Sequence, residues 1–396
     1  MSKVVVAGVG MIPFTKPGAS GTYIEMGAEA ARRALADAGI GYDKVQQAYA
    51  GYVYGDSTSG QAALYPVGMT QIPIINVNNN CSTGSTALYL ARQAVESGAV
   101  DCAIALGFEQ MSPGALDAVF NDRPAPLGRA LELTAELNPE AAAAGIPMAL
   151  LQFGGAGKEH METYGTRMET FAKIRAKASR HAANNPLAVF RKVVSEEDVM
   201  NEKVMWPGVL TRPMACPPTC GAAAAILCSE DFAKKHGLRT GVRILAQSMT
   251  TDSPALYHAR SMIQVVGFDM AREAARQVYE KAGVGPSDVQ VVELHDCFAH
   301  NELLTYESLG LCPVGGAERF VEDGDNTYGG KFVTNPSGGL LSKGHPLGAT
   351  GLAQCYELTH QLRGSAGGTQ VDGASLALQH NLGLGGACVV TLYGRG

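Results

Sequence analysis

The chain has 396 residues, of which 46% are hydrophobic and 17% charged, with 48 glycines and a formal net charge of −6. This balance excludes a disordered chain and predicts two or three units around a large core, with a buried subunit interface. Negative charge without clustered Lys or Arg argues against nucleic-acid binding, and no apolar run approaches the roughly 20 residues of a membrane span.

The chain ends and the cysteines indicate a cytoplasmic protein. A strand begins at Val4 with no secretory leader before it, and residues 393–396 match neither a peroxisomal nor an ER-retention signal. The nine cysteines lie scattered in apolar segments, which predicts free buried thiols rather than disulfides. Two prolines separate Cys216 from Cys220 and no second ligand pair follows, so we expect no metal site.

Short β-rich runs alternate with longer helical patterns along the chain. We expect strands at 4–8, 103–107, 222–228, 242–247, 289–294 and 387–392, and helices at 25–38, 84–96, 269–282 and 349–362. The helices end near glycines, which are a usual stop signal. This order, βαβαβ twice, predicts an α/β fold with a parallel or mixed sheet.

The pattern changes between about residues 120 and 215. Charges increase there, strand signals disappear, and helical pieces such as 168–181 lie among Pro and Asn turns. We predict an inserted helical subdomain. It either covers a ligand site or elaborates the surface, and the sequence leaves both interpretations open.

Two segments of the chain are copies of earlier ones. Residues 29–46 recur at 273–290, with nine of eighteen positions identical. A second echo pairs residues 84–88 with 348–352, and three residues upstream of those segments stand Cys81 and His345. A duplicated scaffold therefore predicts that a thiol lies opposite an imidazole.

Cys81 follows an apolar segment and precedes a helix. Backbone N–H groups and the helix dipole at such a position stabilise a thiolate, lower its pKa and favour a nucleophile. The alternative is a small buried hydrophobic residue, which is the role of most free cysteines.

His345 lies in the glycine-rich segment 338–351, directly before Pro346 and close to a helix start. A histidine there can activate a thiol and later donate a hydrogen bond to a thioester oxygen. The alternative is a loop histidine bonded to a carbonyl group.

A third segment, 293–302, follows the strand predicted at 289–294. His295 and Cys297 are two residues apart, so in an extended backbone both side chains point into one pocket. Asp296 then faces elsewhere, as an anchor or a helix cap. Cys297 is a proton carrier or an inert thiol, and the spacing leaves both open.

Residues 379–387 place three glycines before the final strand. We interpret them as a loop in which backbone N–H groups approach a ligand oxygen, or as a turn that needs small residues.

Together, the segments 78–85 (Asn-Asn-Asn-Cys-Ser-Thr-Gly-Ser), 295–298 (His-Asp-Cys-Phe), 344–348 (Gly-His-Pro-Leu-Gly) and 380–383 (His-Asn-Leu-Gly) resemble the thiolase superfamily, and more narrowly its sterol carrier protein X type. The resemblance spans nearly the whole chain. It implies two duplicated βαβαβ halves in α-β-α-β-α layers with an inserted loop domain. The expected domains are 1–120 with 215–232 returning to it, 121–214 as the insertion, and 233–396.

The chain departs from the common thiolase pattern at three places. Most thiolases have Asn-Glu-Ala-Phe at the segment matching 295–298, and a second catalytic cysteine in a C-terminal Cys-x-Gly loop; here His380 and Asn381 occupy that loop. The resemblance to the sterol-carrier group implies that Cys297 takes the acid/base role instead. Residues 216–221 lack the usual aspartate before the glycine, which leaves the coenzyme A contacts unassigned.

The resemblance implies a 3-oxoacyl-CoA thiolase acting in the degradative direction, on branched-chain or sterol side-chain substrates. In it, Cys81 is the nucleophile, His345 assists its ionisation, and His295 and His345 stabilise the first oxyanion. Cys297 protonates the departing enolate, while N–H groups near Cys81 and Gly383 hold the second oxyanion. Coenzyme A is a co-substrate, and no permanently bound cofactor is expected.

Two alternatives remain beside this one. A thiolase-like retro-aldolase of sterol side-chain CoA esters would use the fold without an acyl-enzyme, and a non-catalytic acyl-CoA or lipid binding protein would show no turnover. The resemblance also implies a homodimer, with a homotetramer as the larger assembly. No lipid-transfer domain is expected within the chain, so a separate lipid-transfer partner is the expectation.

Overall fold

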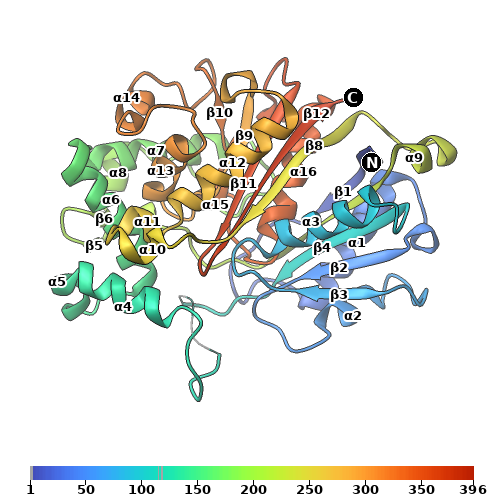
Figure 1. Ribbon diagram of the computed structural model, residues 1–396, viewed down its shortest axis with the longest axis horizontal. Helices are drawn as coiled ribbons and strands as arrows, with labels where there is room; N and C mark the ends of the chain where they lie inside the picture. The colour runs from blue at the N-terminus through green and yellow to red at the C-terminus, as the bar shows by residue number, and fades with distance from the viewer. Residues whose placement is uncertain (1–2, 115, 117–118) are drawn as a thin grey trace.

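The computed structural model of the chain, which describes residues 3–114, 116 and 119–396, contains one mixed ten-stranded sheet (Figure 1). Its N-terminal half holds β1 (Val4–Met11), β2 (Gln47–Gly51), β3 (Ile74–Val77), β4 (Cys102–Glu109) and β7 (Gly221–Ser229). Its C-terminal half holds β8 (Val242–Thr250), β9 (Val291–Glu293), β10 (Val333–Thr334), β11 (Leu376–Gly383) and β12 (Ala387–Arg395).

The strand order repeats between the halves. It is β1-β7-β4-β2-β3 in one half and β8-β12-β11-β9-β10 in the other, which is first, fifth, fourth, second, third in both. The halves meet where β1 and β8 pair through Val5 and Arg243. The predicted duplication is therefore confirmed, and the sheet consists of two five-stranded halves joined at a narrow seam.

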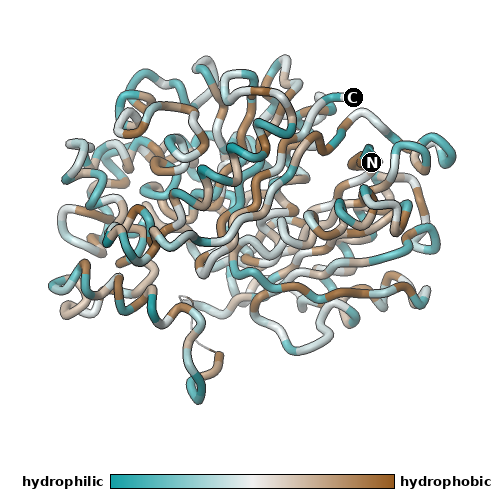
Figure 2. Tube along the Cα trace, in the orientation of Figure 1, coloured by the Kyte–Doolittle hydropathy of each residue, from teal (hydrophilic) through white to brown (hydrophobic). Residues whose placement is uncertain are grey.

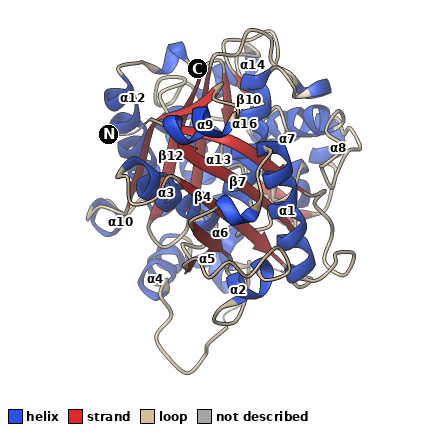
Figure 3. Cartoon of the chain, turned by 90° about the vertical axis from the view of Figure 1, so that its right-hand side faces the viewer, coloured by secondary structure: helices blue, strands red, loops and turns tan. Residues whose placement is uncertain are grey.

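Helices lie on both sides of the half-sheets and between them (Figures 1 and 3). Helix α1 (Tyr23–Ala38) packs on β1 and β7, and α12 (Phe268–Ala282) packs on β8 and β12. Helices α3 (Thr83–Glu96) and α16 (Thr350–Arg363) contact each other and strands of their own halves. These contacts give the α-β-α-β-α layers that the resemblance implies.

The outer helix α1 shows why the layers pack closely. Thr22 and Glu25 form a capping box that fixes its start, and Gly39 in a left-handed conformation ends it. Its buried face is rich in alanine, and a Cβ at Gly10 of β1 would lie under 3.0 Å from the carbonyl oxygen of Ala30. Small residues on both surfaces therefore allow the close contact.

The first turns of the two central helices are buried, and α16 is buried almost along its whole length. In α16 every residue is buried except Tyr356, His360 and Arg363. Figure 2 shows hydrophobic segments along the central strands and hydrophilic segments on the outer helices. The first turns of α3 and α16 consequently lie inside the molecule, where no bulk water competes for their backbone N–H groups.

The remaining helices surround these layers. They are α2 (Ser59–Leu64), α9 (Glu230–His236), α10 (Ala255–His258), α11 (Met262–Val265), α13 (Ala299–Ser308), α14 (Ala317–Glu322) and α15 (Gly339–Ser342). The segment predicted as an insertion contains α4 (Gly128–Leu137), α5 (Pro139–Ala143), α6 (Met148–Tyr164), α7 (Met168–Ala182) and α8 (Glu196–Met200). Its helices α6 and α7 pack on α13, and α7 also packs on α15.

The insertion and the segment 379–387 differ from the secondary structure expected for them. The insertion contains a hairpin of β5 (Val204–Trp206) and β6 (Leu210–Thr211), which is too short to show an alternating pattern. The expected loop at 379–387 is a strand up to Gly383, and the turn occupies only 384–386. Strand β11 lies between β9 and β12 and carries Gln379, His380 and Asn381 inward, so its polar residues hid the strand signal.

The cysteines are free thiols, as predicted; seven are buried, and Cys216 and Cys312 are half-buried. Among the described residues, no helix combines the length and the apolar character that crossing a membrane requires.

Candidate active site

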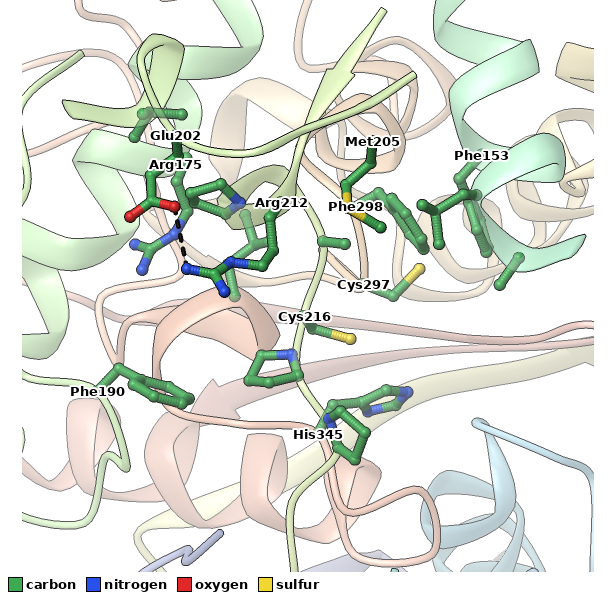
Figure 4. Close-up of a pocket in the computed structure, with 18 of the residues that line it drawn as sticks. Phe153, Arg175, Phe190, Glu202, Met205, Arg212, Cys216, Cys297, Phe298 and His345 are labelled. Carbon is green, nitrogen blue, oxygen red and sulfur yellow. Dashed lines mark hydrogen bonds and ion pairs between the residues drawn. The ribbon is translucent and has the colours of Figure 1, made fainter. Parts of the chain in front are cut away.

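A cavity of about 1530 Å³ opens between the insertion and the two halves of the sheet (Figure 4). Cys81, Cys297 and His345 line it together with residues of the insertion, including Leu150, Phe153, Arg175, Lys192, Met205 and Arg212. The segment 120–215 therefore borders a ligand-sized cavity, and of its two interpretations the covering of a site is the one that fits.

Cys81 lies in the tight connection between β3 and α3, two residues before the helix begins. Asn80 has φ +51°, and the carbonyl oxygens of Asn79 and Asn80 accept hydrogen bonds from Ser82 N and Thr83 N. This turn points Cys81 into the cavity although only 6% of the residue is exposed. The predicted position at a helix N-terminus is therefore present.

The expectation of a lowered thiol pKa is wrong for the resting protein. Burial raises the pKa of Cys81 to about 12, and the charge of Glu109 adds to this increase. Removal from water disfavours a thiolate more than the nearby backbone N–H groups favour it. Cys81 is therefore a thiol until a base accepts its proton.

Glu109, at the end of β4, is a buried carboxylate that the sequence did not single out. It accepts hydrogen bonds from Val53 N (3.0 Å), Tyr54 N (2.9 Å) and Gly348 N (2.9 Å). Burial raises its pKa to about 7, and these N–H groups oppose that increase. Because Gly348 belongs to the loop before α16, Glu109 ties the two halves together next to Cys81.

His345 is held with one ring nitrogen free. Its Nδ1 lies 2.7 Å from Thr350 Oγ1, and that hydroxyl group donates to Pro346 O at 3.1 Å. The hydroxyl therefore accepts from Nδ1–H, which leaves the lone pair on Nε2. His345 Nε2 is buried without a hydrogen-bond partner among the described residues, and burial lowers the pKa of His345 to about 3. The ring is neutral, and its Nε2 lone pair has no hydrogen-bond donor among the described residues.

His295 lies beside His345, with ring centroids 5.0 Å apart and planes at 83°. Its Nδ1 is 3.1 Å from Nδ2 of Asn381, on β11. Burial holds the pKa of His295 well below its ordinary value, and the neighbouring His345 contributes to the decrease. The Cys81 Sγ atom, one ring nitrogen of His295 and one ring nitrogen of His345 all lie within 4.8 Å of one another. The structure thus brings together the thiol and the imidazole that duplication predicted.

Cys297 lines the cavity, but the backbone around it differs from the expected one. Strand β9 ends at Glu293, and Asp296 N bonds to Leu294 O at 3.1 Å, so residues 294–296 turn tightly instead of remaining extended. Cys297 O accepts from Cys216 N at 2.8 Å. Burial raises the pKa of the Cys297 thiol well above its ordinary value, with Cys216 and Cys81 as further causes.

Asp296 is a helix cap, as predicted. Its carboxylate accepts hydrogen bonds from Leu340 N (2.7 Å) and Leu341 N (3.3 Å), at the start of α15. A Cβ at Gly339 would lie under 3.0 Å from Asp296 Oδ2, so only glycine fits there. This contact anchors the segment that leads to His345.

Gly383 ends β11 and lies against the Cys81 connection. A Cβ there would lie under 3.0 Å from Asn79 O and Ser82 Oγ. The α3 and α16 helices approach in the same way, since a Cβ at Gly351 would lie under 3.0 Å from Ser85 Oγ and Ser85 N. Glycines at these contacts let Cys81 and His345 meet.

Cys216 and Cys220 face different surroundings. Cys216 lines the cavity, whereas the Cys220 thiol is buried and donates to Met111 O at 3.4 Å. The two sulfur atoms therefore do not converge on one point.

Comparisons with known proteins agree with this architecture. Residues 4–194 match the family "Thiolase, N-terminal domain", and residues 253–393 match "Thiolase C-terminal domain-like". The chain therefore belongs to the thiolase family, and it is an acyltransferase. Within that family it is 57% identical over 400 residues to sterol carrier protein 2 of Oryctolagus cuniculus, a match that covers 100% of this chain and 72% of the relative.

Solved structures share the fold. The Ltp2-ChsH2(DUF35) aldolase aligns with a TM-score of 0.83 at 21% identity, covering 100% of this chain and 98% of that one. Human mitochondrial 3-ketoacyl-CoA thiolase in complex with CoA aligns with a TM-score of 0.75 at 20% identity, with the same coverage of both chains. The chain thus has the thiolase fold.

Proposed function

We propose that this chain is a thiolase that cleaves 3-oxoacyl-CoA with coenzyme A through an acyl-Cys81 intermediate. The observation that carries the proposal is the meeting of Cys81, His295 and His345 within 4.8 Å, where Cys81 and His345 line a large cavity. The products are a shortened acyl-CoA and acetyl-CoA or propionyl-CoA.

The first half-reaction begins when His345 Nε2 accepts the proton of Cys81. The thiolate attacks the 3-keto carbon, and the oxyanion accepts hydrogen bonds from His295 and from protonated His345. The oxyanion then collapses, the bond between C2 and C3 breaks, and its electron pair forms the enolate of the departing CoA ester. Cys297 donates a proton to this enolate and becomes a thiolate.

The second half-reaction releases the acyl group. Coenzyme A gives its thiol proton to the Cys297 thiolate and attacks the acyl carbon on Cys81. N–H groups near Cys81 and Gly383 hold this second oxyanion. When the tetrahedral intermediate breaks, Cys81 leaves and recovers its proton from His345. Cys81, His295, Cys297 and His345 are then back in their starting protonation states.

The cavity supports coenzyme A and a bulky acyl group as ligands. Its volume of about 1530 Å³ exceeds the range of about 300–1,000 Å³ that drug-sized ligands occupy. Lys16, Lys192 and Lys203 line it and can pair with phosphate groups. Leu150, Phe153, Met205, Phe298 and Leu384 give it an apolar wall. This combination favours branched-chain or sterol side-chain substrates.

A panel of CoA esters tests the proposal. Straight-chain, α-methyl-branched and steroid side-chain 3-oxoacyl-CoA esters are mixed with coenzyme A, and release of acetyl-CoA or propionyl-CoA is followed by chromatography. We expect turnover with the branched or steroid esters. Tight acyl-CoA binding without release of either product would favour the non-catalytic binding protein instead.

The retro-aldolase alternative is separated by its substrate. A retro-aldolase would cleave a 3-hydroxyacyl-CoA ester of a steroid side chain to a carbonyl compound without free coenzyme A. The proposed thiolase needs the 3-oxo ester and free coenzyme A. Cleavage of the hydroxy ester alone would replace the proposal by this alternative.

We also propose a homodimer that pairs along β3. Among the described strands β3 is at the sheet edge, where it pairs with β2, and its four residues are half-buried. Nearby Met69 and Tyr65 are 74% and 48% exposed. Edge strands with apolar neighbours invite pairing with another chain. A homotetramer, a cytoplasmic location and a separate lipid-transfer partner stay predictions.

A further inference from the structure

Asn381 is a buried amide that joins the two halves of the site. It lies on β11, in the C-terminal half, and none of its surface is exposed. Its Nδ2 donates to the backbone oxygen of Cys81 at 3.1 Å and its Oδ1 accepts from Ser85 Oγ at 2.8 Å. The third contact of Asn381 is with His295 Nδ1, at 3.1 Å.

The surrounding hydrogen bonds determine which end of this amide faces His295. Tyr393 donates to Gln379 Oε1, so the Gln379 amide nitrogen points to Ser85 Oγ and donates to it at 2.8 Å. Ser85 therefore directs its own proton to Asn381 Oδ1. The oxygen end is held by Ser85 and the nitrogen end by the Cys81 carbonyl, so a flipped amide would place two oxygen atoms against each other.

The orientation of Asn381 fixes the proton of His295. Because Asn381 presents an N–H group, His295 Nδ1 must accept, and a neutral imidazole that accepts at Nδ1 carries its proton on Nε2. His345 has the opposite arrangement, since Thr350 accepts from its Nδ1 and leaves Nε2 with a lone pair. The two rings next to Cys81 therefore have different protonated nitrogens.

We propose that Asn381 is a positioning residue that keeps the proton of His295 on Nε2. His295 is thereby the hydrogen-bond donor of the site, while His345 is its proton acceptor. The inference rests on the proposed function and adds to it the reason why one neutral histidine donates a hydrogen bond while the other accepts a proton. If His295 carried its proton on Nδ1, its Nε2 lone pair would face the developing oxyanion and repel it.

The inference predicts a difference between the two half-reactions. Carbon–carbon cleavage needs the His295 donor, whereas transfer of an acyl group between Cys81 and coenzyme A uses backbone N–H groups for its oxyanion. Exchange of isotopically labelled coenzyme A into acetyl-CoA reports on transfer alone. Cleavage of acetoacetyl-CoA by coenzyme A reports on both steps.

Two variants of the full chain test the role of Asn381. Asn381→Ala removes the amide, and Asn381→Asp supplies an oxygen that accepts from His295 Nδ1–H and so reverses the tautomer. We expect both to lower kcat for cleavage about 10²–10³-fold, as loss of one oxyanion donor does, while exchange stays within about threefold. A matched control is Ser248→Ala, which removes a hydrogen bond between the buried Ser248 hydroxyl on β8 and Gln277 on the outer helix α12, and leaves both rates unchanged.

Equal losses in cleavage and exchange would overturn the inference, because they would mean that Asn381 only supports the Cys81 backbone. Unchanged cleavage in the variants would overturn it as well. A wild-type protein without exchange or cleavage would instead remove the proposed function itself.

Neutron diffraction from deuterium-exchanged wild-type crystals gives a readout that needs neither activity nor a folded variant. We expect deuterium on Nε2 of His295 and on Nδ1 of His345. Deuterium on Nδ1 of His295 would overturn the inference.

Discussion

The two halves of the molecule share one strand order but deliver different chemistry. In the N-terminal half, the connection before the buried helix α3 carries Cys81; in the C-terminal half, the connection before α16 carries His345. Each stands three residues upstream of a glycine, Gly84 or Gly348. Duplication thus provides the meeting point, and a change of side chain at equivalent positions provides a nucleophile and its base.

The halves also differ in the titratable groups that they bury near Cys81. The N-terminal half contributes the carboxyl group of Glu109, whose charge acts on Cys81, and the C-terminal half contributes the buried rings of His295, His345 and His380. The comparison suggests that the C-terminal half handles protons while the N-terminal half forms the covalent bond. The following changes test that division, beginning with the largest effect.

Replacing Cys81 removes the proposed nucleophile, which is the group that the N-terminal half contributes to the reaction. We expect Cys81→Ser to lower cleavage of a 3-oxoacyl-CoA ester by about 10⁴-fold or more, because a hydroxyl group is far less acidic than a thiol. Cys312→Ser, at a half-buried thiol outside the cavity lining, is the control and keeps wild-type activity. Wild-type cleavage by the Cys81 variant would end the assignment.

Replacing His345 and His295 one at a time distinguishes the role of the proposed base, His345, from that of the proposed hydrogen-bond donor, His295. His345→Ala lowers both cleavage and the exchange of labelled coenzyme A into acetyl-CoA, by about 10²–10⁴-fold, because Cys81 loses its base. His295→Ala lowers cleavage by about 10²–10³-fold and leaves exchange nearly intact. Steady-state rates of both reactions are the measurement, and the same pattern in the two variants would contradict the division.

The glycine contact between the central helices tests how the halves meet. Gly351 of α16 contacts Ser85 of α3, whereas the position equivalent to Gly351 in the N-terminal half is Ala87. We expect Gly351→Ala to cost about 1–3 kcal/mol in the free energy of unfolding, since its Cβ has no space. Gly128→Ala, where a Cβ meets open space, is the control in urea unfolding and changes the free energy little.

Two buried groups, Glu109 of the N-terminal half and His345 of the C-terminal half, have opposite effects on stability as pH falls. The pKa of His345 falls to about 3 on folding, so its stabilisation is present above its ordinary pKa and is lost as pH falls toward 3. The pKa of Glu109 rises to about 7, so the fold gains stability from this group as pH falls from 7 toward its ordinary value.

Urea unfolding at about pH 7 and about pH 5.5 measures these contributions. His345→Gln should lose about 1–2 kcal/mol less than wild type on acidification, and Glu109→Gln should lose about 1–2 kcal/mol more. Identical pH dependence in the two variants and the wild type would show that neither group titrates differently on folding.

The sequence predicted the parts of the fold that have strong local signals. Apolar residues at helical spacing, ending near Gly, predicted the outer helices α1 and α12, because periodicity and capping act over a few residues. The echo around Gly84 and Gly348 predicted that Cys81 meets His345, because equivalent positions of a duplicated unit come together in the fold.

Features that depend on tertiary contacts were missed. Strand β11 was hidden because Gln379, His380 and Asn381 are polar, and the hydrogen bonds that Gln379 and Asn381 make to Tyr393 of β12 and Ser85 of α3 are tertiary contacts. Glu109 gave no signal since its partners, Tyr54 and Gly348, are distant in sequence. The thiol pKa was misjudged because the extent of burial at a helix start is a tertiary property.

The covalent intermediate is the most direct test of the central claim. The protein is mixed with a 3-oxoacyl-CoA ester without free coenzyme A, quenched in acid, digested and analysed by mass spectrometry. The account predicts an added acyl mass on the peptide that contains Cys81, and its disappearance when coenzyme A is supplied. An acyl mass on Cys297 or Cys216 instead, or turnover with an unmodified Cys81 peptide, would contradict it.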